Sequence, residues 1–175
     1  EEVERLEEEV RRRKKEWEDR LEEVKRRNEK AKRESERENE KIAREVREVV
    51  KELRERGGGG EELRKRLEDL ARKLEKYKEE LRRRSRKMAE EVERVKKELR
   101  ERNEELARRV EELERAGADK RRLEELLRDH SRMIRRVEAE LDKSLEDHKR
   151  ALDENEKRID EWLERLRKIV EEVEK

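Results

Sequence analysis

The apolar residues of this chain recur every eighteen residues, and this spacing restricts the possible folds more than any other feature. In residues 123–173, for example, Leu123 is followed eighteen positions later by Leu141 and then by Ile159. Eighteen residues make five turns of an α-helix at 3.6 residues per turn, so each recurring side chain returns to the same side of an undistorted helix. A seven-residue repeat would instead force a left-handed supercoil. The spacing therefore predicts straight helices without superhelical twist.

The same period runs through the rest of the chain. Leu6, Val24 and Ile42 are spaced in this way, and residues 63–113 repeat most regularly. At 100° per residue, the apolar arc covers about 60° of the first helix and about 120° of the second. The wider arc is what a helix buries when it contacts two neighbours. The remaining circumference is charged and reads as a solvated surface.

Glycine interrupts the pattern in two places. All five glycines lie at 57–60 and at 117. These breaks define three expected helices and two linkers: residues 1–56, 61–116 and 119–175, joined by residues 57–60 and 117–118. Connections this short leave no room for the chain to travel back along a helix, so successive helices must be antiparallel. We therefore expect an all-α fold over residues 1–175, a straight antiparallel three-helix bundle that runs up, down and up.

The two breaks differ in chemistry. Gly117 can supply the left-handed residue that ends the second helix, and Asp119 can accept hydrogen bonds from the first free N–H groups of the third. Four consecutive glycines fix no backbone geometry, so residues 57–60 are expected to form a flexible linker. A phosphate-binding loop would also need a preceding strand and a Lys-Ser/Thr pair, which this sequence lacks.

Composition excludes several classes of function. Charged residues make up 63% of the chain, but 56 Lys and Arg nearly balance 55 Asp and Glu, so no strong net field favours nucleic acid or an anionic membrane. The chain has no Cys, which excludes disulfides and thiolate metal sites. It has neither an apolar run long enough to span a bilayer nor a signal-peptide core, so we expect a soluble protein without a targeting signal.

Polar residues with short or ring side chains occupy some positions of the predicted apolar faces. They are Asn28, Ser35, Asn39, Tyr77, Ser85, Asn103, His130, Ser144, His148 and Asn155. Antiparallel pairing predicts that residues level with one another have numbers that sum to about 117 across the first two helices and about 236 across the last two, within about three. The arithmetic places Asn28 about level with His148, Asn39 opposite Tyr77, and Asn103 near His130. It also places Ser35, Ser85 and Asn155 together in the next layers.

Such grouping is what a hydrogen-bonded network requires, because a buried polar group without a partner costs several kcal/mol. We therefore expect these residues to form structural networks in the core. His148 is predicted to be buried, neutral and hydrogen-bonded to Asn28 or, failing that, to Ser85. Between Val24 and Ile42 the first helix has only Ala31 as an apolar face residue, so this section is either a polar core or no core.

Catalytic and metal-binding readings have less support. His130 and His148 are the only histidines, and eighteen residues of helix separate them by roughly 27 Å, so they cannot share a metal ion. A nucleophile such as Ser85 or Ser144 near His148 is conceivable. The sequence has no Gly-rich oxyanion loop, and a packed bundle offers no substrate cleft. We expect no enzymatic activity, no cofactor and no bound metal. Trp17, Trp162 and Tyr77 are expected in the core rather than on a base-stacking surface.

The repeat, the Glu, Lys and Arg at exposed sites, the absence of Pro and Phe, the tetraglycine, and the Ser, Asn and His in the core together resemble de novo designed parametric helical bundles with built-in hydrogen-bond networks. The resemblance covers the whole chain and is one of style rather than of a motif. It implies a stable scaffold without evolved activity, made by recombinant expression. The chain is also somewhat similar to spectrin-type triple-helical repeats, whose helices are much shorter, and to single charged helices, which lack a continuous apolar stripe.

Two functional hypotheses follow. The first is a monomeric structural scaffold that requires no partner. The alternative is a helical binding module that accepts a further helix or self-associates through one face of the bundle. The narrow apolar arc of the first helix argues against a spare apolar stripe, whereas its polar centre could satisfy the polar groups of a partner helix.

Overall fold

Three α-helices make up the computed structural model, which describes residues 2–56 and 60–174. They are α1 (Glu2–Arg56), α2 (Glu61–Arg115) and α3 (Lys120–Glu174), each 55 residues long. The described residues contain no strand. These bounds confirm the expected all-α fold to within about a residue at each end. The expected flexible linker falls mainly on residues 57–59, which lie outside the described residues.

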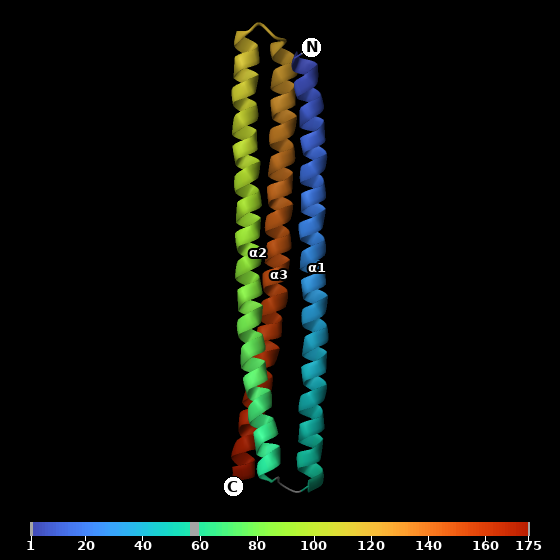
Figure 1. Cartoon of the computed structure of the whole chain (residues 1–175), viewed down its shortest axis with the longest axis vertical. Helices are drawn as coiled ribbons and strands as arrows, with labels where there is room; N and C mark the ends of the chain where they lie inside the picture. The colour runs from blue at the N-terminus through green and yellow to red at the C-terminus, as the bar shows by residue number, and fades with distance from the viewer. Residues whose placement is uncertain (1, 57–59, 175) are drawn as a thin grey trace. The chain divides into compact units, whose positions relative to one another are not determined.

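The helices form two compact units. Unit 1 comprises Glu1–Asn28 and Met88–Glu146, and unit 2 comprises Glu29–Lys87 and Asp147–Lys175. Each unit takes one segment from every helix, and in each the segments of α1, α2 and α3 lie side by side as a three-helix bundle (Figure 1). The absence of superhelical twist stays a prediction.

Ion pairs between helices show the antiparallel register in each unit. Every α1–α2 pair named here has residue numbers that sum to 118: Arg20–Glu98 and Arg27–Glu91 in unit 1, and Glu45–Lys73 in unit 2. The α2–α3 pairs sum to 238: Lys96–Asp142 in unit 1 and Lys78–Asp160 in unit 2. The α1–α3 pairs instead have a nearly constant difference in residue number, 115 for Glu7–Arg122 and 118 for Glu18–Arg136, as parallel helices do. The expected sums of about 117 and 236 are confirmed.

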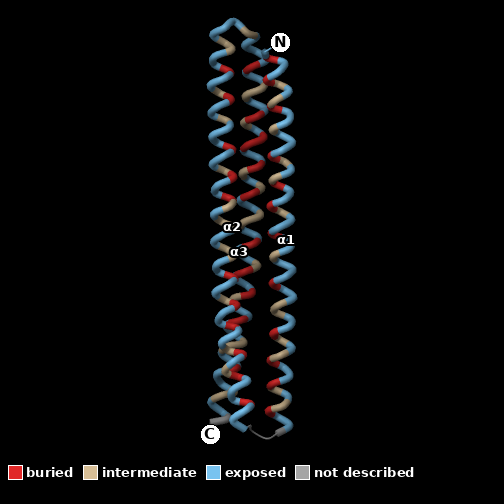
Figure 2. The backbone as a smooth tube through the Cα atoms, in the orientation of Figure 1, coloured by how far each residue is buried: buried red, intermediate tan, exposed pale blue. Residues whose placement is uncertain are grey.

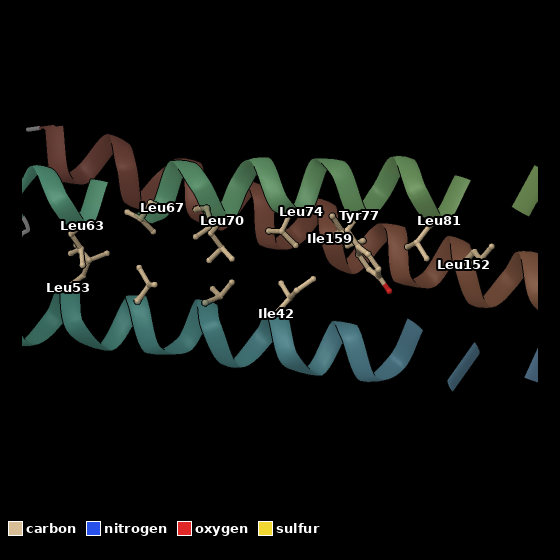
Figure 3. Close-up of a cluster of buried hydrophobic side chains, with 13 residues drawn as sticks. Ile42, Leu53, Leu63, Leu67, Leu70, Leu74, Tyr77, Leu81, Leu152 and Ile159 are labelled. Carbon is tan, nitrogen blue, oxygen red and sulfur yellow. The ribbon is translucent and has the colours of Figure 1, made fainter. Parts of the chain in front are cut away.

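Buried residues follow the side of each helix that faces its neighbours (Figure 2). Unit 1 has two apolar clusters, one around Leu6, Leu106 and Leu123 and one around Trp17, Leu99 and Leu141. Unit 2 has one, to which α1, α2 and α3 all contribute, and the side chains of α1 and α2 point toward one another in Figure 3. Its labelled members are Ile42, Leu53, Leu63, Leu67, Leu70, Leu74, Tyr77, Leu81, Leu152 and Ile159. Among the described residues, no large apolar side chain is exposed.

The turn between α2 and α3 is fixed by its backbone hydrogen bonds. Gly117 has φ = 86° and donates its N–H to the carbonyl of Glu114, while Ala118 donates to the carbonyl of Leu113. This pair of bonds is the Schellman motif, which needs a left-handed residue where Gly117 stands. Asp119 Oδ1 then accepts from the N–H of Arg121 and caps α3. Both roles assigned to this break from the sequence are confirmed.

Substitution of Gly117 should therefore act through the backbone alone. A Cβ at Gly117 would meet nothing within 4 Å, so Gly117→Ala adds no clash but forces an L-residue into the left-handed region. We expect a loss of about 1–2 kcal/mol in the free energy of unfolding, measured by chemical denaturation. Gly60→Ala is the matched control, since Gly60 also has open space but no positive φ, and it should change stability by less than about 1 kcal/mol. Equal effects of the two substitutions would contradict this account of the turn.

Candidate functional site

All ten polar residues singled out in the sequence are buried or half-buried, so they belong to the interior. Asn28, Ser35, His130, His148 and Asn155 are at most 6% exposed. The middle of α1 is therefore a polar core. Trp17 and Tyr77 are buried as expected, whereas Trp162 is only half-buried.

The largest group of hydrogen bonds centres on Ser35 in unit 2. The Asn155 amide donates to Ser35 Oγ, and the Tyr77 hydroxyl donates to Ser35 Oγ and to its backbone oxygen, both at 3.2 Å. Asn39 Nδ2 donates to Asn155 Oδ1 at 2.6 Å. The Tyr77 ring extends from α2 toward α1 (Figure 3). One buried serine hydroxyl thus joins α1, α2 and α3, and we call these four residues the polar layer.

Asn39 and Tyr77, which the sequence places opposite each other, have different hydrogen-bond partners. Asn39 bonds to Asn155 on α3, and Tyr77 reaches Ser35, one helical turn earlier on α1. The phenol ring is long enough to pass the residue level with it. Ser35 is also the more deeply buried acceptor, at 1% exposure.

Two polar pairs lie in unit 1. Asn28 Nδ2 donates to Ser144 Oγ, which joins α1 to α3. His130 Nδ1 lies 3.0 Å from Asn103 Oδ1, which joins α3 to α2. Because a carbonyl oxygen only accepts, Nδ1 carries the proton of the neutral ring. The predicted contact between Asn103 and His130 is confirmed.

His148 departs from the prediction. It is buried as expected, but neither ring nitrogen has a hydrogen-bond partner in the protein, and Asn28 donates to Ser144 instead. The predicted bond to Asn28 or Ser85 is therefore wrong. A comparison with the layer one period earlier gives the reason. The register that pairs His130 with Asn103 places Ser85 opposite His148, and the serine side chain is too short to reach the ring.

Burial also decides the protonation of the core. It lowers the pKa of His130 from 6.5 to about 4, with the Arg13 charge as a smaller cause. Burial likewise lowers the pKa of His148 and raises that of Tyr77. All three side chains are neutral at pH 7, as expected when burial disfavours the charged form.

Comparison of the two units shows a feature that sequence reasoning missed. One period away from the polar layer, the equivalent positions of unit 1 are all apolar: Trp17, Leu21, Val95 and Val137. These four residues belong to one buried cluster. The sequence shows which positions are equivalent. It does not show that the four polar residues form one hydrogen-bonded group. All four positions of this layer are therefore apolar in unit 1 and polar in unit 2.

The side chains considered from the sequence for metal binding or catalysis do not come together in the described residues. Across residues 2–56 and 60–174, no group of three or more His, Asp or Glu side chains could hold a metal ion. Ser85 and Ser144 were the conceivable nucleophiles, and neither is hydrogen-bonded to His148. The hydrogen bonds that these polar residues make link one helix to another.

No helix in the described part of the chain is long and apolar enough to cross a bilayer.

Comparison of the chain with protein-family models, with curated proteins and with solved structures finds no match.

The Asn103–His130 pair suggests a test in which an asparagine is introduced opposite His148. Ser85→Asn should give His148 the partner that Asn103 gives His130, and a satisfied buried pair should raise the free energy of unfolding by about 1 kcal/mol. The mirror substitution, Asn103→Ser, should lower it by about 1–3 kcal/mol because it removes the partner of His130. Both changes are measured by chemical denaturation at pH 7.5. A destabilising Ser85→Asn would show that Ser85 does not face His148.

The low pKa of His130 makes stability depend on pH. The unfolded ring, with a pKa of about 6.5, binds a proton before the folded ring does, so stability falls as the pH drops from about 6.5 toward about 4. Between pH 7.5 and pH 5 we expect this residue to lower the free energy of unfolding by about 2 kcal/mol. Denaturation of the protein and of His130→Leu at both pH values isolates the effect from the carboxylates, which both proteins share. Equal losses in the two proteins would contradict the assignment.

Proposed function

We propose that this chain is a de novo designed structural scaffold with no evolved biochemical activity. The observation that carries the proposal is the polar layer: four polar residues from three helices form hydrogen bonds with one another, and the equivalent positions one period away are all apolar. Replacement of a whole layer at fixed spacing is a means of specifying one alignment of helices.

The surface supports a scaffold role. Charged residues make up 63% of the sequence, and large apolar side chains are not exposed among the described residues. Large exposed apolar patches mark protein and membrane interaction sites. The ion pairs on the surface are mostly half-exposed and contribute at most about 1 kcal/mol each. Stability then comes mainly from the apolar clusters.

Sedimentation equilibrium tests the scaffold role. We expect a single species at the monomer mass of 21.8 kDa over a wide range of concentrations, because the apolar faces are already covered. Chemical denaturation should show the same midpoint at each concentration, since the stability of a monomer does not depend on concentration. A dimer mass, or a midpoint that rises with concentration, would instead favour the alternative of a helical module that self-associates.

A further inference from the structure

The ion pairs between α1 and α2 reverse their charge from one eighteen-residue period to the next. Three pairs occupy equivalent positions: Glu9–Arg109 at 2.7 Å and Arg27–Glu91 at 2.7 Å in unit 1, and Glu45–Lys73 at 3.2 Å in unit 2. The α1 member is acidic, then basic, then acidic. The hydrogen bond from Arg109 lowers the pKa of Glu9.

The interface of α1 with α3 reverses in the same way. Glu7 pairs with Arg122, and one period later Lys25 pairs with Glu140 at 3.6 Å. The α2–α3 interface keeps its charge. There α2 is basic and α3 acidic at both periods: Lys96–Asp142 and Arg100–Glu138 in unit 1, and Lys78–Asp160 and Arg82–Glu156 in unit 2. Among these pairs, the charges therefore reverse only at the interfaces that α1 makes with α2 and α3.

These charges respond differently when one helix is displaced by one period. If α1 is displaced by one period, the apolar residues in the overlap again lie opposite apolar residues. Glu9 then lies opposite Glu91, however, and Arg27 lies opposite Lys73. Displacement in the other direction brings Arg27 to Arg109 and Glu45 to Glu91. The same displacement of α3 along α2 keeps opposite charges together. Two α1 pairs do not discriminate. Glu34 and Arg84 occupy the positions equivalent to Glu52–Arg66. For Glu18–Arg136, α1 again has a glutamate, Glu36, one period later.

The polar side chains of α1 penalise the same displacement. Ser35 would give up its place to Trp17 or Leu53, which leaves the Tyr77 hydroxyl and the Asn155 amide without their acceptor. Asn28 would likewise be replaced by Val10 or Val46 opposite Ser144. Buried polar groups that lose their partners are costly. The surface ion pairs and the buried polar groups therefore favour the same alignment of α1.

From these contacts we infer that the surface of α2 and α3 that contacts α1 is a register-selective docking site for a helix of α1's own sequence. The occupant is α1, supplied from the same chain or in trans by a second copy. This goes beyond a scaffold role, because a scaffold needs α1 to be attached but does not need it to be recognised. The chain is then a pair of recognition partners joined through residues 57–60.

The test uses the full chain with a protease recognition sequence inserted between Gly58 and Gly59. After cleavage, the two fragments should stay together as a 1:1 complex. A labelled peptide of residues 1–56 should exchange into this complex and compete equally with the native fragment. The same peptide with Glu9→Arg, Arg27→Glu and Glu45→Lys should compete roughly 10- to 100-fold less well at low salt, because three half-exposed attractions become repulsions.

The control peptide carries Glu8→Arg, Arg26→Glu and Glu40→Lys, the same changes at exposed positions of α1. Glu8 has an arginine four residues later, as Glu9 does, and Arg26 has a glutamate four residues earlier, as Arg27 does, so these two interactions within the helix are matched. It should compete within about threefold of the native peptide, as expected for exposed charges. The complementary change in α2, Arg109→Glu, Glu91→Arg and Lys73→Glu, should restore competition by the reversed peptide.

Two results would overturn the inference. The first is separation of the fragments on cleavage. The second is equal competition by the native and reversed peptides. In either case a monomeric, cooperatively unfolding intact chain would leave the scaffold proposal standing, so the two failures are distinguishable.

Discussion

Hydrogen bonding between buried polar groups of different helices is the interaction on which the rest of the structure depends. An eighteen-residue repeat makes the apolar faces nearly equivalent after a displacement of one period, so within the remaining overlap the burial of Leu and Val distinguishes the two alignments only weakly. The displaced helix does leave one period of its apolar face uncovered. An unpaired buried group costs about 1–3 kcal/mol, whereas an exposed ion pair contributes at most about 1 kcal/mol. The polar layer and the Asn28–Ser144 pair therefore contribute more to the choice of alignment than the surface charges, which favour the same alignment.

Much of this architecture could be predicted from the sequence, because the helical period and the short connections determine which residues lie level with one another. The ends of the three helices, the antiparallel order, the roles of Gly117 and Asp119, and the pairing of Asn103 with His130 all follow from spacing and turn chemistry. Each depends on the backbone, whose dimensions hardly vary between helices.

The partners of individual polar side chains could not be predicted as well. An error of three residues in register is about 4.5 Å of helix, close to one turn and comparable to the reach of Tyr77. Level positions therefore did not identify the Tyr77–Ser35 bond, and they gave His148 a partner that it does not have. Where one side chain is long or its neighbour short, rotamers rather than register decide the contact. Ser85 illustrates this, because it occupies the position of Asn103 but does not bond to the histidine.

A double-mutant cycle on Ser35 and Asn155 tests most directly whether pairing across helices holds the core in one alignment. The free energy of unfolding is measured for the protein, for Ser35→Ala, for Asn155→Ala and for the double variant. Since the Asn155 amide donates to Ser35 Oγ inside the core, we predict a coupling energy of about 1–3 kcal/mol. A coupling energy near zero would show that the two residues are buried without depending on one another, and it would contradict the account.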